Sequence, residues 1–263
     1  MENGFSAEEI DTGRPHPARI YDYLLGGKDN YAVDRKAADA LAVAAPEVRI
    51  GVRANRAFLR RAVRHVVGSG VRQILDVGTG LPTSPNVHET AQEVAPDVRI
   101  AYVDNDPIVN AHANALLGRS GATSVVLADL RDPRAVLDHP DVRRVIDFGE
   151  PVALLLVAVL HFLTDEEKPA EVIATLRDAL PAGSYLVLSH ATGDFADRSD
   201  AQAVYNNATA TLNLRTRAEV ERFFDGFALE EPGLVQVPFW RPEAPLPPRS
   251  GDIGFYGGVA RLA

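Results

Sequence analysis

The chain has 263 residues, of which 46% are hydrophobic and 24% charged, a composition typical of a globular protein with a full core. Its net charge of −9 argues against a nucleic-acid partner, because nucleic-acid-binding surfaces usually carry a basic excess. The lack of cysteine excludes disulfides, thiolate metal sites and cysteine nucleophiles. The first residues are acidic and do not resemble a secretory signal, so we expect a cytoplasmic protein.

The first 70 residues precede any predicted strand. Residues 1 to about 13 are expected to form a frayed tail, and residues 17–70 carry a helical pattern that Gly26-Gly27 and Pro46 interrupt. Tyr23 and the glycine pair put an aromatic side chain and a hinge ahead of the core, as a lid over a bound ligand requires. Lys28 either pairs with a ligand carboxylate or is an ordinary residue at a helix C-terminus. We interpret residues 1–70 as an N-terminal helical cap or lid.

Strands and helices alternate from residue 71 onward. The pattern predicts strands over 73–77, 98–103, 124–128, 152–159 and 184–189, and helices over 86–94, 107–117 and 165–180. Five apolar strands separated by helix-length segments predict a parallel sheet covered on both faces. The apolar run 152–163 is too short to span a bilayer, so no membrane attachment is expected.

The segment 191–263 has a different pattern. A polar stretch at 194–207 is followed by a predicted helix at 217–224 and by two strand-like runs at 234–239 and 255–262, which would close the sheet edge. We predict a Rossmann-like core over residues 71–263, with an insertion at about 191–216. The expected fold class is α/β, with a mostly parallel seven-stranded sheet, helices on both faces and the N-terminal cap.

Residues 73–82 form an apolar strand that leads into the glycine turn Gly78-Thr79-Gly80, and Asp76 stands two residues before the first glycine. A nicotinamide dinucleotide favours a third glycine, where this chain has Thr83, and Asp76 would put a negative charge beside its pyrophosphate. A ligand with an ammonium and a sulfonium would be attracted to that charge. The turn therefore resembles motif I of the Rossmann-like S-adenosylmethionine (SAM) methyltransferases.

The other predicted strands also end in polar residues. Asp104 and Asn105 follow the second strand; Asp104 lies 24 residues beyond Gly80, near the spacing of a ribose-binding acid, although it is also a candidate helix cap. Asp129 and Leu130 follow the third strand, where an acid can accept the exocyclic amine of adenine or simply terminate the strand in a turn. Because ligands of such sheets lie at the carboxyl ends of the strands, these residues are expected to share one site.

Two further candidates lie outside these strand ends. His161, just past the fourth strand, is either a general base or a structural, hydrogen-bonded histidine; methyl transfer depends chiefly on alignment and does not require a base. Arg56 belongs to a helical arginine face that is either solvated or, with Asn55, turned into the cleft to bind a carboxylate. No histidine and acid cluster has metal-binding spacing.

Seven blocks of the chain, in order, resemble a family of SAM-dependent methyltransferases that was long a domain of unknown function and is abundant in actinobacteria such as Streptomyces. The blocks cover residues 19–30, 55–61, 76–83, 102–107, 128–133, 156–162 and 185–190. The resemblance implies a class I methyltransferase fold and SAM binding, with S-adenosylhomocysteine (SAH) as the product. It supplies no substrate.

The sequence thus favours transfer of a methyl group from SAM to oxygen or nitrogen of a small molecule enclosed by the cap. We expect Asp76 and the turn backbone to hold the amino-acid end of SAM, Asp104 the ribose and Asp129 the adenine. Two alternatives stay open: a SAM-binding regulatory or scaffold protein without transferase activity, and an NAD-dependent oxidoreductase. A homodimer is also left open.

Overall fold

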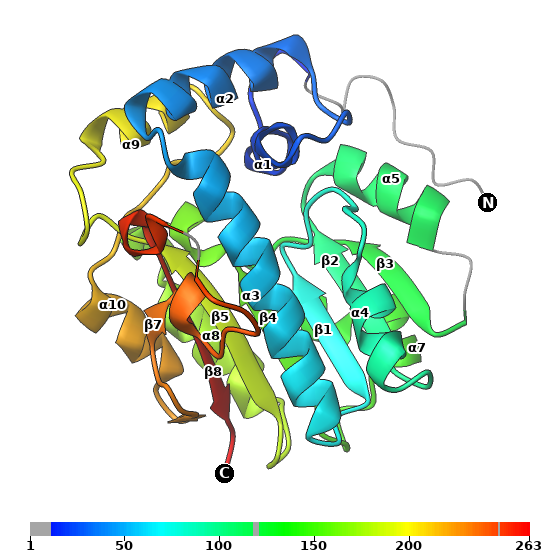
Figure 1. The fold of residues 1–263 in the computed structure, drawn as a ribbon. Helices are drawn as coiled ribbons and strands as arrows, with labels where there is room; N and C mark the ends of the chain where they lie inside the picture. Colours follow the sequence, from blue (N-terminus) through cyan, green and yellow to red (C-terminus); the bar gives the residue numbers. More distant parts are fainter. Residues whose placement is uncertain (1–11, 118–120, 247) are drawn as a thin grey trace.

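The structure is a computed structural model that describes residues 12–117, 121–246 and 248–263. Its strands are β1 Gln73–Val77, β2 Arg99–Asp104, β3 Thr123–Leu127, β4 Ala153–Val157, β5 Tyr185–Ala191, β6 Ala228–Leu229, β7 Val235–Gln236 and β8 Phe255–Arg261. They form one sheet in the order β3-β2-β1-β4-β5-β8-β6, and β7 also pairs with β8 (Figure 1). The first five strands are parallel and β8 runs antiparallel to β5, so the predicted mostly parallel sheet is confirmed.

The sheet reverses its order of winding at β1. This strand pairs with β2 on one side and with β4 on the other, and Asp76 lies opposite both Tyr102 and Leu155. Chain connections therefore leave β1 and β4 in opposite directions, which opens a crevice at their carboxyl ends. The topology thus sets a ligand site beside the glycine turn.

Ten α-helices surround the sheet in the described residues. They are α1 Pro17–Leu25, α2 Ala32–Ala44, α3 Val48–Gly68, α4 Val87–Val94, α5 Pro107–Leu117, α6 Pro133–Asp138, α7 Pro140–Val145, α8 Pro169–Asp178, α9 Ser199–Tyr205 and α10 Arg217–Glu221. Side chains alternate along each strand, so Ile74 packs in one apolar cluster with α3 and α4, whereas Leu75 packs in a second with α6, α7 and α8. Both faces of the sheet are therefore covered. None of the described helices is long and apolar enough to cross a membrane.

A third apolar cluster lies above the carboxyl ends of the strands. It joins Ile20, Leu24 and Leu41 of the first two helices to Ala201 and Tyr205 of α9. Figure 1 shows α1, α2 and α9 as a layer across this end of the sheet, with α3 descending from it along one face. The N-terminal helices and the segment after β5 therefore cover the crevice together.

The sequence pattern and the structure differ in the shorter elements. Of the strand predicted over 234–239 only two residues pair, because Val237–Phe239 turn into a 3-10 helix around Pro238. Helices α6 and α7, which the pattern did not predict, each begin with a proline after a capping Asp132 or His139. Because β6 and β7 are separate two-residue strands on the same side of β8, the described part of the chain forms a sheet of eight strands, one more than predicted. Most of the predicted tail lies outside the described residues.

Candidate functional site

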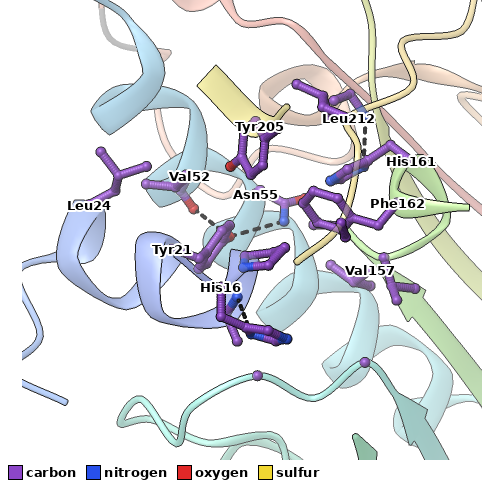
Figure 2. Close-up of a pocket in the computed structure, with 18 of the residues that line it drawn as sticks. His16, Tyr21, Leu24, Val52, Asn55, Val157, His161, Phe162, Tyr205 and Leu212 are labelled. Carbon is purple, nitrogen blue, oxygen red and sulfur yellow. Dashed lines mark hydrogen bonds between the residues drawn. The ribbon is translucent and has the colours of Figure 1, made fainter. Parts of the chain in front are cut away.

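A cavity of about 440 Å³ lies between the carboxyl ends of β1, β2 and β4 and the layer of α1, α2 and α9 (Figure 2). Its volume is within the range of roughly 300–1,000 Å³ that is usual for small-molecule sites. Ten residues predicted as site residues line it: Arg56, Asp76, Gly78, Thr79, Gly80, Asp104, Asn105, Asp129, Leu130 and His161. Residues distant in sequence thus meet in one site.

The glycine turn has a backbone that other residues adopt only with strain. Gly78 has a φ of +78°, and a Cβ on it would lie 2.5 Å from Val159, so glycine is required there for close packing. Gly80 has a φ of +67°, but a Cβ on it would meet nothing within 4 Å. The space beside Gly80 is therefore open to a ligand that approaches the backbone.

Asp76 brings a buried carboxyl group to this space. Burial raises its pKa to about 7, and the neighbouring Asp104 adds to the rise. Arg56 opposes the shift only in part; its guanidinium donates hydrogen bonds to the carbonyl oxygens of Thr83 and Pro85, at 2.9 and 3.2 Å. A buried carboxyl group whose charge is poorly compensated favours a cationic ligand, and the ammonium of SAM meets that requirement.

Asp104 is held rigidly at the end of β2. One carboxylate oxygen accepts the N–H of Gly80 at 2.8 Å, and the other accepts the N–H of Asp106 at 3.0 Å. Burial raises its pKa to about 6 despite these bonds. Asp106, not Asp104, caps α5 by accepting the N–H of Ile108 at 2.9 Å. Each oxygen of Asp104 retains a lone pair that can accept a ribose hydroxyl.

Asp129 lies at the rim of the same cavity and is half-buried. It accepts the backbone N–H of Arg131 at 2.9 Å and the side-chain amide of Asn105 at 3.0 Å, and the Arg131 guanidinium pairs with it at 3.1 Å. These bonds outweigh burial and lower the pKa of Asp129. A fixed negative charge at this place can accept an exocyclic amine.

His161 also lines the cavity and is buried. Its Nδ1 accepts the backbone N–H of Ala191 at 3.2 Å, and burial, together with His190 and Arg215, lowers its pKa well below the usual value. The bonded Nδ1 carries no proton, so the neutral ring holds its proton on Nε2 and presents a donor. This geometry argues against proton abstraction by His161 and favours a hydrogen-bonding role.

Three predicted residues do not reach the cavity lining. The ring of Tyr23 packs under the guanidinium of Arg49, 5.1 Å from its centroid. Gly27 lies against Asp22, because a Cβ on it would be 1.9 Å from Oδ1 of that residue. Lys28 is exposed beyond the end of α1. The structure therefore does not bring these three residues together with the strand-end acids.

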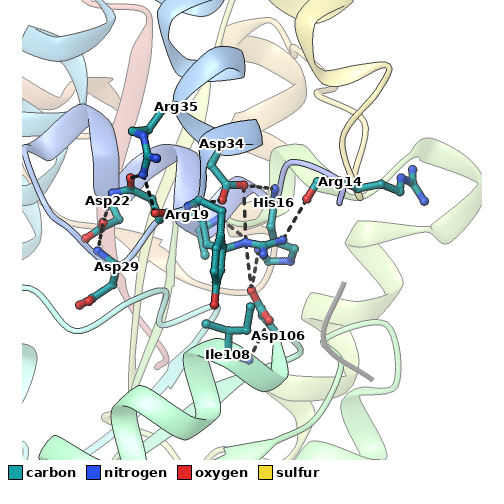
Figure 3. A network of polar contacts seen from close by, with 12 residues as sticks. Arg14, His16, Arg19, Asp22, Asp29, Asp34, Arg35, Asp106 and Ile108 are labelled. Atoms are coloured by element: carbon teal, nitrogen blue, oxygen red, sulfur yellow. Dashed lines mark hydrogen bonds and ion pairs between the residues drawn. The ribbon is translucent and has the colours of Figure 1, made fainter. Parts of the chain in front are cut away.

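A buried polar network joins α1 and α2 to the residues after β2 (Figure 3). Nδ1 of His16 lies 3.2 Å from the Asp106 carboxylate, and Nε of Arg19 lies 3.5 Å from Asp34 and 3.9 Å from Asp106. Burial lowers the pKa of His16 despite the acids. Sequence reasoning missed this network, since its members meet only when the cap folds over β2; the His-Pro start of α1 was the single local signal.

The strand order and the cavity at the switch point define a Rossmann-like class I methyltransferase fold. The N-methyltransferase NodS from Bradyrhizobium japonicum, crystallised with SAH, shares this fold at a TM-score of 0.50 and 15% identity, over 93% of this chain and 98% of that one. The sequence profile of the S-adenosyl methyltransferase family matches residues 3–263, so the chain belongs to that family.

Two solved structures are far more similar. A DUF574 family protein from Streptomyces avermitilis is 46% identical with a TM-score of 0.93, covering 97% of this chain and 100% of its own. A candidate methyltransferase from Thermobifida fusca is 40% identical with a TM-score of 0.91, covering 97% of each chain. No curated protein matches by sequence. The resemblance found in the seven blocks is confirmed: the protein is a SAM-dependent methyltransferase by family, and the NAD-dependent alternative was wrong.

Proposed function

We propose that the protein transfers the methyl group of SAM to an oxygen or nitrogen atom of a small molecule held under the cap. One observation carries this proposal: the cavity has a polar floor at the glycine turn and the strand-end acids, and an apolar roof built by the cap and α9. A single enclosed space with these two linings suits a charged cofactor beside a less polar acceptor.

The cofactor residues are proposed from their contacts and charge. We assign Asp76 to the ammonium of the amino-acid end, the backbone of Gly78-Thr79-Gly80 to the same end, and Arg56 to its carboxylate. Asp104 would hold the ribose hydroxyls, and Asp129, with Asn105 and Leu130 beside it, the adenine. The buried carboxyl group of Asp76 and the open space at Gly80 support this orientation.

When bound, SAM supplies an electrophilic methyl group on a sulfonium. The lone pair of the acceptor would form the new bond to carbon, the electron pair of the broken bond would stay on sulfur to give SAH, and the acceptor proton would be released to bulk solvent as the products leave. Oxygen and nitrogen carry such lone pairs without prior proton removal. The chain's contribution is then to align the acceptor and exclude water, with His161 as a hydrogen-bond donor rather than a base.

We also propose a separate role for each of three segments of the chain. Residues 1–70 would act as the cap and residues 191–216 as a lid-like insertion on a core formed by residues 71–263, which the shared apolar cluster of α1, α2 and α9 supports. The acidic, cysteine-free composition supports a cytoplasmic enzyme with a small-molecule partner and no nucleic acid.

Calorimetry with SAH tests the cofactor assignment, and SAH release from SAM in the presence of an acceptor panel tests the transfer. We expect SAH to bind the wild type, and to bind Asp76→Asn at least about tenfold more weakly, because a buried charge pair is lost. Wild-type protein that binds neither SAM nor SAH would overturn the proposal. Binding without turnover on any oxygen or nitrogen acceptor would limit it to cofactor binding.

A further inference from the structure

Among the described residues, the roof of the cavity brings no unpaired cation to the acceptor side. Glu47 and Arg198 form an ion pair there, with side chains only 13% and 10% exposed. Asp22, which also lines the cavity, accepts hydrogen bonds from the backbone of Asp29 and the side chain of Asn30, at 3.0 and 2.7 Å. The apolar and aromatic lining of this side is formed by Leu24, Leu41, Val52, Phe162, Tyr205 and Leu212.

Asn55 lies at the boundary between the two linings. The preceding turn of α3 belongs to the apolar roof through Val52, while the next residue, Arg56, contacts the loop after the glycine turn through the carbonyl of Thr83. Figure 2 draws Asn55 in the middle of the lining, with Tyr21 and Phe162 on either side in this view. An acceptor in the roof would bring its reacting atom toward the cofactor at this boundary.

The Asn55 side chain has an acceptor without a partner. Its Nδ2 donates to the hydroxyl of Tyr21 at 3.1 Å, and that hydroxyl donates to the carbonyl of Val52 at 3.0 Å. Asn55 is only 1% exposed, and its Oδ1 has no hydrogen-bond partner among the described residues. Rotating the amide would not relieve this, because Nδ2 would then take the buried position without a partner. With the amide as the structure has it, Oδ1 is the unpaired acceptor.

We infer that the methyl acceptor is a largely apolar molecule without a negative charge, whose O–H or N–H group donates a hydrogen bond to Asn55 Oδ1. This inference rests on the proposed function and names its substrate class. A ligand donor satisfies the buried oxygen, whereas a carboxylate or phosphate would be repelled by its lone pairs and would meet no unpaired cation among the described roof residues. Asn55 is a positioning and specificity residue for the reacting atom, and it removes no proton.

The test uses full-length protein saturated with SAH and three matched probes on benzene, naphthalene, indole and cyclohexane scaffolds. On each scaffold the primary amide has N–H donors, the N,N-dimethyl amide has none, and the carboxylate is ionised at about pH 8. Ligand-observed NMR titration gives the affinity of each probe. We expect the primary amides to bind about tenfold more tightly than both counterparts on the scaffolds that fit.

Substitutions connect this preference to one atom. Asn55→Leu has a similar volume and no acceptor, so it should abolish the preference while leaving SAH affinity within about twofold of the wild type. The same change at Asn114, whose exposed amide donates to Asn110 within α5, is the matched control and should alter neither quantity. Asn55→Asp keeps an acceptor of the same shape and should weaken carboxylate binding further. This variant keeps the inference testable if the leucine variant does not fold.

Three results would overturn the inference. Carboxylates that bind as tightly as the primary amides would contradict the exclusion of an anion, and failure of every primary amide on all scaffolds would contradict the hydrogen bond to Oδ1. A loss of SAH affinity in Asn55→Leu as large as that in Asp76→Asn would assign Oδ1 to the cofactor. Failure of the proposed function itself would differ, because the wild type would then not bind SAH.

Discussion

Asp76 holds a carboxyl group where the folded chain disfavours its charge. Burial raises its pKa from 3.8 to about 7, so the folded state binds this proton more tightly than the unfolded chain does. The free energy of unfolding therefore decreases as the pH rises from 3.8 through about 7, and it shows no further decrease from this group above that range. A residue that costs stability beside an open cavity is better explained by ligand binding than by packing.

Replacing this residue should separate stability from binding. Asp76→Asn removes the buried charge, so we expect the ligand-free protein at about pH 8 to gain about 1–2 kcal/mol in the free energy of unfolding, measured with urea. SAH affinity should fall at least about tenfold. Asp97→Asn, in an exposed pair with Arg72, is the control and should change neither property. A variant that is less stable than the wild type would show Asp76 to be a structural residue.

The pH dependence of SAH binding follows from the same carboxyl group. Protonation of Asp76 removes the negative charge to which we assign the ammonium, so SAH affinity should decrease as the pH falls below about 7, approaching tenfold per pH unit. Protonation of Asp104, with a pKa of about 6, should cause a second decrease in SAH affinity at lower pH. Calorimetry from about pH 5 to 8 measures both decreases. In Asp76→Asn the decrease that begins near pH 7 should vanish; if it remains, another group controls binding.

At the scale of elements, the long segments were predictable from sequence and the short ones were not. The strands β1 to β5 are apolar runs, and the helical pattern of residues 17–70 divides into α1, α2 and α3 at the predicted interruptions. Helix α9 has only seven residues in a polar stretch, too short for a period, and it forms where Ala201 and Tyr205 pack on the distant cap. Tertiary contact decides such elements.

The same distinction holds for the site. The acids at residues 76, 104 and 129 line one cavity because parallel strands end at the same edge, a consequence of topology that the strand pattern already contained. Lys28 lies outside the cavity because its direction depends on the turn at Gly26, which the sequence leaves open. The proton on Nε2 of His161 depends on a backbone N–H from β5, a contact that no local pattern encodes.

The network around Asp34 should control how firmly the cap is attached. Its carboxylate is fully buried, pairs with Arg19 and accepts the backbone N–H groups of His16 and Tyr31, both at 2.9 Å. Asp34→Ala leaves a buried guanidinium without this partner, a change that typically costs about 3–5 kcal/mol. Hydrogen exchange measured by mass spectrometry should show α1 and α2 exchanging faster, with the central strands unchanged.

Asp39→Ala supplies the comparison on the same helix, because Asp39 is 62% exposed and its pair with Arg49 lies at the surface. Its exchange pattern should match that of the wild type. Equal protection of α1 and α2 in both variants would show that the apolar cluster alone holds the cap and that the buried ion pair contributes little. Faster exchange throughout the sheet in Asp34→Ala would show instead that cap and core unfold together.

At the scale of the whole molecule, a bound cofactor should stabilise both parts, because residues of the cap and of the sheet line one cavity. A ligand that binds only the folded state stabilises it by about 2.7 kcal/mol at a concentration one hundred times Kd. For a chain of 263 residues this corresponds to a rise in Tm of about 5–10 °C. Scanning calorimetry with SAH should show that rise in a single transition. NAD at the same concentration should leave Tm unchanged, since Asp76 opposes its pyrophosphate; a comparable rise with NAD would contradict the charge argument on which the cofactor orientation depends.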